Sequence, residues 1–212
     1  MPPRPSPAWT AILLTGGTGS RLGGADKSTV DLGGSTPLEM VLTSLPADIA
    51  VIIVGPTTPT SRPVAFCRED PPGSGPAAAI AAAMPLVSTT AVGVIAVDMP
   101  WAAPVLGSAV SALGTHPDAD VLLPLDADGR RQLLCSAWRT AALRESVAAA
   151  GDLLGRPVHH LLAGLDVCEL DLPRTHTEHL SDIDTPEDLE RERQRFADRR
   201  LAARANGEKA PD

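Results

Sequence analysis

Residues 11–27 read AILLTGGTGSRLGGADK: four apolar residues, then a glycine-rich loop that ends on an acid and a lysine. The apolar run at 11–14 is typical of a strand buried on both faces. The glycines that follow let the backbone approach a ligand and direct N–H groups at phosphate oxygens. Open α/β sheets bind their ligands at the carboxyl ends of strands, where this loop would lie. The stretch therefore predicts a site for a phosphorylated ligand.

Further apolar runs of strand length alternate with segments of helical spacing. We expect strands at residues 51–54, 92–97, 121–123, 132–137 and 167–170. We expect helices at residues 37–45, 75–86, 104–113 and 140–150, and a last helix with Thr185 as N-cap and Pro186 at the first helical position. This alternation predicts an α/β fold, a Rossmann-like three-layer α/β/α sandwich around a mostly parallel sheet.

The chain shows no internal repeat, so we expect a single domain over residues 10–198. Residues 1–9 lack the apolar core of a signal peptide, and we expect a loose leader there. Residues 199–212 are charged and small, and we expect this tail to fray.

Composition narrows the partners and the compartment. The formal net charge of −8 argues against a duplex nucleic acid partner, which needs a basic face, but not against a small phosphorylated ligand. A membrane span needs a run of about 18 apolar residues, and none is present. The 3 cysteines are far apart, which favours a reducing cytoplasm over a disulfide framework. We expect a monomer.

Three chemistries use a glycine-rich loop after a strand. A Walker A loop needs glycine before Lys27, but Asp26 stands there and would oppose the phosphates. A dinucleotide-binding loop needs a further glycine where Leu22 falls, and short-chain dehydrogenases, which residues 15–19 resemble, use a tyrosine that this chain lacks. A nucleotidyltransferase loop needs glycines and then cations, and Arg21 and Lys27 supply these. The plain alternative is a glycine-rich turn with solvated charges.

Residues 14–27 fit the pattern Leu-x-Gly-Gly, three residues, Arg, Met or Leu, Gly-Gly, one residue, Asp-Lys, in which Leu22 occupies the position for Met or Leu. It closely resembles the signature of the molybdenum cofactor guanylyltransferase (MobA-like NTP transferase) family. The resemblance extends from about residue 10 to 189 and implies the nucleotide-diphospho-sugar transferase-like version of the fold. It implies a Mg²⁺-dependent enzyme whose catalytic cations are Arg21 and Lys27. It also implies that Lys27 binds the nucleotide together with the backbone of Leu14, Thr15, Gly16 and Gly17, where Thr15 replaces the usual alanine.

Three acids follow the loop. Asp98 follows the apolar run 92–97, where a carboxylate is costly unless it is used or paired. The resemblance implies that the Asp-x-Pro beginning at Asp98 binds Mg²⁺ and the nucleotide. The alternative is that Asp98 forms a turn or caps a helix. Asp70 precedes a Gly-Pro segment in which Ala79 replaces the family's closing glycine; the resemblance implies a nucleotide contact, against a surface loop. Asp184, before Thr-Pro-Glu-Asp, is a second metal ligand, an acceptor-side residue or a helix cap.

Other positions carry weaker signals. The resemblance implies that Gly55, after the second strand, contacts base or ribose. Residues 128–137 resemble the family's acceptor-side hairpin, with Leu133 in place of proline. Arg130 and Arg131 are either contacts to acceptor phosphate or residues of a solvated loop. The adjacent His159 and His160 point to different faces of regular structure, and we interpret them as ordinary residues.

The implied reaction joins GMP from GTP to the phosphate of molybdopterin (the molybdenum cofactor) and releases pyrophosphate. Gly17 favours GTP, because the corresponding cytidylyltransferases carry Leu-Ala-Ala-Gly at this place. Two alternatives remain open. One is a related nucleotidyltransferase that uses CTP or another acceptor, such as a sugar phosphate or phospholactate. The other is a non-catalytic nucleotide binder.

Overall fold

The computed structural model describes residues 9–16 and 27–205, with only the backbone of Lys27, Ala203 and Arg204. Seven strands form one sheet in the order β3-β2-β1-β4-β6-β5-β7. The bounds are β1 Trp9–Leu14, β2 Ala50–Val54, β3 Ala65–Cys67, β4 Ala91–Ala96, β5 Val121–Pro124, β6 Cys135–Arg139 and β7 Val167–Leu170. All neighbours are parallel except β6, which runs antiparallel to β4 and β5. The carboxyl ends of β2, β1 and β4 therefore meet at one edge.

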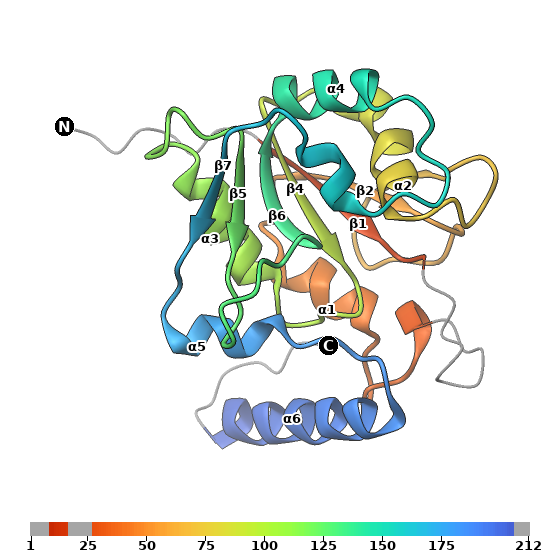
Figure 1. The fold of residues 1–212 in the computed structure, drawn as a ribbon. Helices are drawn as coiled ribbons and strands as arrows, with labels where there is room; N and C mark the ends of the chain where they lie inside the picture. Colours follow the sequence, from red (N-terminus) through yellow and green to blue (C-terminus); the bar gives the residue numbers. More distant parts are fainter. Residues whose placement is uncertain (1–8, 17–26, 206–212) are drawn as a thin grey trace.

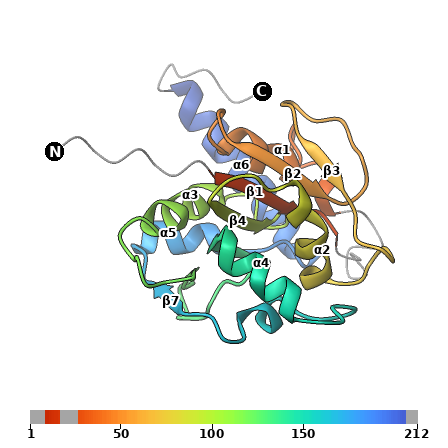
Figure 2. The same ribbon diagram turned by 90° about the horizontal axis from the view of Figure 1, so that it is seen from above.

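Helices cover both faces of the sheet (Figures 1 and 2). α1 (Pro37–Ser44) and α3 (Ala103–Ala112) pack on one face, and α2 (Pro76–Ala83), α4 (Thr140–Ala149) and the 3-10 helix η4 (Val158–Leu162) pack on the other. Alternate residues of β1 enter the two cores, Ala11 and Leu13 on one side and Ile12 and Leu14 on the other. This two-sided burial explains why the strand is apolar throughout.

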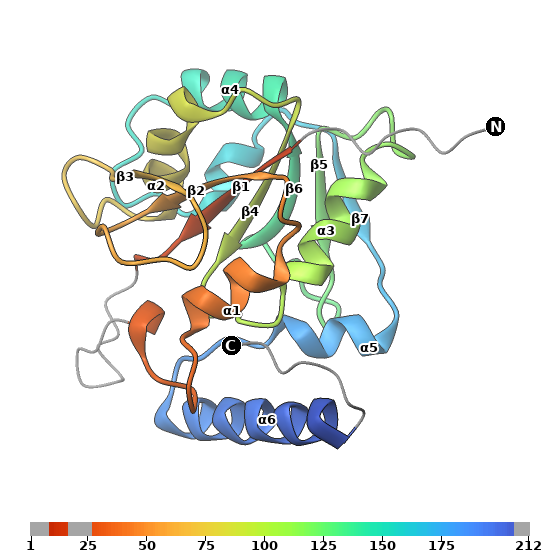
Figure 3. The same cartoon turned by 180° about the vertical axis from the view of Figure 1, so that it is seen from behind.

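A third group of helices lies at one end of the molecule. The short helices α5 (Arg174–Thr177) and η5 (Glu178–Leu180) lead to α6 (Pro186–Ala205). Figures 1 and 3 both show α6 lying beyond α1 and α5, outside the layers that cover the sheet. A separate apolar cluster attaches it and contains Leu32, Met40, Trp101, Ile183 and Phe196. The remaining short helices are η2 (Lys27–Thr29) and η3 (Met84–Leu86).

The predicted fold class is confirmed, and four details differ. The strand expected at residues 132–137 begins at Cys135 instead, because Gln132 belongs to a hairpin loop in which its N–H donates to Pro124 O at 2.8 Å. β3 was not predicted; its three residues are only half-buried or exposed and show little apolar pattern. Trp9, which we placed in the leader, is a buried strand residue. α6 continues to Ala205, past the expected domain end at 198.

Across the described residues, 9–16 and 27–205, no helix is both long enough and apolar enough to span a bilayer.

Candidate active site

The candidate site lies at the edge where three parallel strands end in register. Leu14 pairs with Val54 of β2 on one side and with Ala96 of β4 on the other. From β1 the chain order proceeds to β2 and β3 on one side, and then crosses to β4 on the other. Such a reversal opens a crevice for ligands at the carboxyl ends of the strands. The segments that leave these ends carry Gly16, Gly55 and Asp98.

Thr15 and Gly55 contact each other at this edge. The backbone N–H and the Oγ1 hydroxyl of Thr15 both donate to Val54 O, at 3.2 and 3.0 Å. A Cβ added to Gly55 would lie 1.9 Å from Thr15 Oγ1, so no side chain fits there. The N–H of Gly55 donates to Cys67 O at 3.0 Å. Both residues are therefore fixed by the ends of β2 and β3.

The first residues of the glycine-rich run differ in what they can offer a ligand. Leu14 and Thr15 are 5% and 7% exposed, so their side chains face the protein. The N–H of Thr15 and the carbonyl of Leu14, which accepts from Val97 N at 3.1 Å, serve the sheet. Gly16 is exposed, and a Cβ built on it would meet nothing within 4 Å. The accessible part of the run thus begins at Gly16.

Gly17 and Arg21 lie outside the described residues, and so does the side chain of Lys27. The backbone of Lys27 begins η2, the short helix at the far end of the glycine-rich run.

Asp98 lies in the turn that follows β4 and is half-buried. Its carbonyl accepts a hydrogen bond from Ile183 N at 3.0 Å. This bond joins the turn to a segment 85 positions later in the numbering, from residue 98 to residue 183. The structure therefore brings the backbones of Asp98 and Asp184 together, as the candidate acid pair requires.

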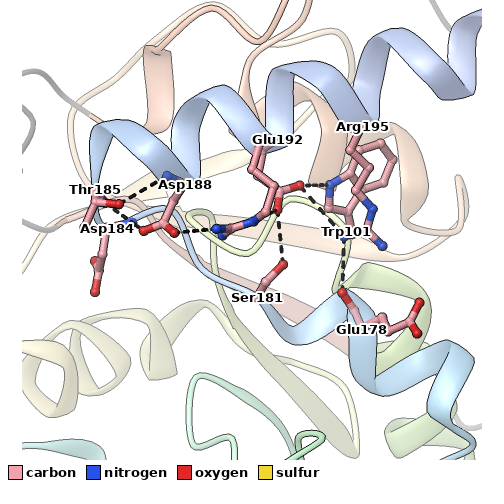
Figure 4. A network of polar contacts seen from close by, with 9 residues as sticks. Trp101, Glu178, Ser181, Asp184, Thr185, Asp188, Glu192 and Arg195 are labelled. Carbon is pink, nitrogen blue, oxygen red and sulfur yellow. Dashed lines mark hydrogen bonds and ion pairs between the residues drawn. The ribbon is translucent and has the colours of Figure 1, made fainter.

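At the start of α6, the side chains of Thr185 and Asp188 cap the helix, and the side chain of Asp184 points elsewhere (Figure 4). Thr185 Oγ1 accepts from Asp188 N at 3.1 Å, and Asp188 Oδ2 accepts from the N–H groups of Thr185 and Asp184 at 2.8 and 3.1 Å. This reciprocal arrangement is a capping box. Burial raises the pKa of Asp188, but hydrogen bonds from Thr185, Arg191 and Asp184 outweigh it and lower the pKa to about 2. Figure 4 shows the Asp184 carboxylate pointing away from this cap.

Asp70 is exposed in the linker between β3 and α2. The linker is anchored further along, where Gly155 N donates to Ser74 O at 2.7 Å. Gly75 is the N-cap of α2 with φ of +93°, a conformation that favours glycine. Ala79, which replaces the family's closing glycine, is 8% exposed and packs in the core under α2. Asp70 thus lies beyond the end of β3, two strands away from β1.

In the hairpin after β5, the charged side chains interact within the hairpin or with Glu169 of β7. Asp126 Oδ1 accepts from the N–H groups of Asp128 and Arg130, each at 2.9 Å, and Gln132 donates to Asp126 Oδ2 at 2.8 Å. Burial raises the pKa of Asp126, but these hydrogen bonds lower it overall. Arg130 pairs with Asp128 at 3.3 Å and Arg131 with Glu169 at 2.7 Å, both on the surface. Exposed pairs of this kind contribute little stability and can reopen.

Sequence reasoning missed Glu192 and Trp101. Glu192 lies in a helix rich in charged residues, where nothing in the pattern distinguishes one buried glutamate, yet it is 1% exposed. It accepts a hydrogen bond of 2.5 Å from the indole N–H of Trp101, a residue three positions after Asp98. Among residues 9–16 and 27–205, no group of three or more His, Cys, Asp or Glu side chains gathers as for a metal.

A parallel sheet with Gly16 and Asp98 at the ends of adjacent strands is typical of α/β proteins that bind a ligand at this edge. Residues 11–166 match the family described as the MobA-like NTP transferase domain. The chain belongs to this family and is a nucleotidyltransferase.

Individual relatives agree with this assignment. A probable molybdenum cofactor guanylyltransferase of Natronomonas pharaonis is 28% identical over 201 residues, which cover 89% of this chain and 98% of the relative. The molybdopterin-guanine dinucleotide biosynthesis protein A of Archaeoglobus fulgidus has a similar fold, with a TM-score of 0.70, 23% identity, and coverage of 89% and 99% of the two chains.

The same fold also serves other nucleotides. The 2-C-methyl-D-erythritol 4-phosphate cytidylyltransferase of Thermus thermophilus matches with a TM-score of 0.63 at 19% identity, covering 88% of this chain and 98% of its own. The architecture alone therefore does not select the base or the acceptor.

Proposed function

We propose that this enzyme transfers GMP from GTP to the phosphate of molybdopterin and releases pyrophosphate. The observation that carries the proposal is the convergence of Gly16, Gly55 and Asp98 at the ends of β1, β2 and β4. The sequence pattern at residues 14–27 and the printed function of the Natronomonas relative support the choice of GTP and molybdopterin.

The residues present suit Mg²⁺. Asp98 and Asp184 offer carboxylate oxygens on segments joined by the bond from Ile183 to Asp98. Magnesium prefers oxygen ligands, and in nucleotide sites it uses one or two carboxylates together with phosphate oxygens and water. Two acids, without a larger cluster, are therefore enough. The ion would supply charge compensation for the triphosphate as the α–β bond breaks. We assign its protein ligands to Asp98 and Asp184.

The chain's own residues bind and orient the reactants. In the reaction an oxygen of the acceptor phosphate attacks the α-phosphorus of GTP, and pyrophosphate leaves with the electrons of the α–β bond. The backbone from Gly16 onward binds phosphate, with Leu14 and Thr15 holding it in place. Arg21 and Lys27 compensate negative charge on the triphosphate and in the transition state. Gly55 contacts base or ribose through its backbone, and Asp70 binds the nucleotide from the β3 side.

Pyrophosphate release tests the reaction. The purified protein is incubated with Mg²⁺, molybdopterin and each of the four nucleoside triphosphates in turn, and the product is identified by mass spectrometry. We expect pyrophosphate and the guanine dinucleotide with GTP alone. Turnover with CTP in place of GTP would overturn the base assignment. GTP binding without turnover on molybdopterin, a sugar phosphate or phospholactate would identify a non-catalytic binder.

The chain offers a matched lysine control. Lys27 and Lys209 are its only lysines. We expect Lys27→Ala to abolish turnover and leave the unfolding temperature unchanged, whereas Lys209→Ala retains turnover. Loss of the fold in Lys27→Ala would contradict a purely catalytic role for this residue.

A further inference from the structure

Glu192 is a buried carboxylate on α6 that the proposed chemistry does not use. Its side chain is 1% exposed, in a helix whose other charged residues face solvent or the surface. Trp101 Nε1 donates to its Oε2 at 2.5 Å, and Ser181 Oγ donates to its Oε1 at 3.3 Å (Figure 4). A carboxylate removed from water needs such partners, because an unpaired buried charge is strongly destabilising.

Two arginines compensate the charge of Glu192. Arg191 Nε lies 3.6 Å from Oε1, and Arg195 lies 3.8 Å from Oε2. The guanidinium carbons of Arg195 and Arg199 also lie 4.9 and 4.4 Å from the centroid of the Trp101 ring. The ring packs in the same apolar cluster as Ile183 and Phe196. Trp101 is thus held by the hydrogen bond from its N–H, by the arginines that lie over its ring and by apolar packing.

The partners of Glu192 lie at equal sequence distances from the two candidate metal ligands. Trp101 comes three residues after Asp98, and Ser181 comes three residues before Asp184. The two segments also meet directly, where Ile183 N donates to Asp98 O at 3.0 Å. One carboxylate therefore bonds to both segments that carry the acid pair.

We propose that Glu192 is a positioning residue, which holds the 98–101 turn and the 181–184 segment together so that Asp98 and Asp184 face one metal ion. The metal part of this inference rests on the proposed function. Residues that orient metal ligands without touching the metal commonly set its affinity.

Trp101→Phe is the decisive variant, because it keeps an aromatic six-membered ring and removes the pyrrole part of the indole, including the N–H that reaches Glu192. Trp138→Phe is its matched control. Trp138 is fully buried in β6, and its Nε1 donates to Ser136 Oγ at 2.7 Å. Each substitution removes one indole hydrogen bond, but only the first touches the acid-bearing segments. Glu192→Gln, which retains an acceptor oxygen for Trp101, serves as the conservative variant, with Glu192→Ala as the full deletion.

Two measurements separate the structural and metal parts of the proposal. The first is hydrogen exchange at the amide of Ile183, followed by NMR without nucleotide or metal. We expect this amide to exchange at least about tenfold faster in Trp101→Phe and Glu192→Ala, and at a near-native rate in Trp138→Phe. Glu192→Gln should lie between wild type and Glu192→Ala. The second is the affinity for Mn²⁺ in the presence of GTP, measured by the EPR signal of the free ion. We expect a loss of about tenfold in Trp101→Phe and almost none in Trp138→Phe.

Each outcome decides a different point. Unchanged exchange at Ile183 in Trp101→Phe, or equal acceleration in Trp138→Phe, would overturn the positioning role. Faster exchange with unchanged Mn²⁺ affinity would show that Glu192 joins the segments without serving the metal, which also overturns the proposal. If wild-type protein binds no Mn²⁺ with GTP, the proposed metal site fails, and the exchange comparison still decides whether Glu192 holds the two segments together.

Discussion

At the scale of single residues, Gly55 leaves less space for a Cβ than any other glycine that the structure describes. We predict that Gly55→Ala lowers the free energy of unfolding by roughly 1–3 kcal/mol, because its Cβ would overlap Thr15 Oγ1 at 1.9 Å. Gly107→Ala in α3 is the control, since a Cβ there meets nothing within 4 Å, and it should be neutral or stabilising by up to about 1 kcal/mol. Urea unfolding measures both.

A second substitution tests the cause. Thr15→Ala in the Gly55→Ala background removes the overlapping hydroxyl and leaves only a contact of 3.3 Å to the Thr15 Cβ. We expect part of the lost stability to return. If the double variant is less stable than Gly55→Ala alone, the overlap is not the source of the loss.

Cys135 gives a second prediction at this scale. It is fully buried, and burial raises the pKa of its thiol to about 12. Since the thiolate is the reactive form, we expect Cys135 to resist a disulfide reagent at pH 8 in the native protein and to react once the protein unfolds in urea. Mass spectrometry of the labelled peptides distinguishes it from Cys67 and Cys168, which are half-buried. Rapid native labelling of Cys135 would contradict this prediction.

At the scale of elements, the cap of α6 depends on Asp188. Its pKa of about 2 lies below the ordinary aspartate value of 3.8, so its stabilisation is complete above pH 3.8 and disappears as the pH falls toward 2. We predict that Asp188→Asn lowers the free energy of unfolding at pH 7 by about 1–2 kcal/mol, and that the difference from wild type shrinks below about pH 4.

Asp198→Asn is the matched control for this cap, because Asp198 is exposed on the same helix and accepts a hydrogen bond from Gln194 at 2.8 Å. Unfolding curves between pH 3 and 7 should show almost no change for it. A constant deficit of Asp188→Asn at every pH would mean that shape, not charge, stabilises the cap.

The elements also show what the sequence alone could predict. Strands such as β4 were predictable because a short run of buried aliphatic residues, rich in valine and isoleucine, is typical of a strand in a sheet covered on both faces. The cap of α6 was predictable because Thr185 and Pro186 act locally. β3 and η4 were not, since their residues form structure through neighbours distant in sequence: β3 by pairing with β2, and η4 by packing beside α2 and α4. The burial of Glu192 could not be predicted for the same reason, because its partner Trp101 lies 91 positions away in the sequence.

For the candidate site, the loop, Gly55 and Asp98 were predictable as neighbours, because parallel strands end at one edge. The proximity of Asp184 to Asp98 was suggested only by family resemblance; the bond between Ile183 and Asp98 supplies its physical reason. Gly17, Arg21 and the side chain of Lys27 lie outside the described residues, and the roles of all the candidate site residues stay predictions.

At the scale of the whole molecule, ligand binding should raise stability. A ligand that binds only the folded state stabilises it by about 2.7 kcal/mol at 100 times its Kd. We predict that GTP with Mg²⁺ raises the unfolding temperature more than CTP with Mg²⁺ at equal concentration, and that Asp98→Asn reduces the shift. A larger shift with CTP would contradict the choice of guanine.

The reversed strand β6 has a consequence for how such enzymes diversify. Because β6 returns antiparallel between β4 and β5, the hairpin at 126–132 emerges at the same edge as the glycine-rich loop while belonging to one continuous stretch of chain. The segments that follow β1, β2 and β4 at this edge, including the turn with Asp98, all precede this hairpin in the sequence. Exchange of a single block of coding sequence can therefore replace this hairpin and leave the segments after β1, β2 and β4 intact.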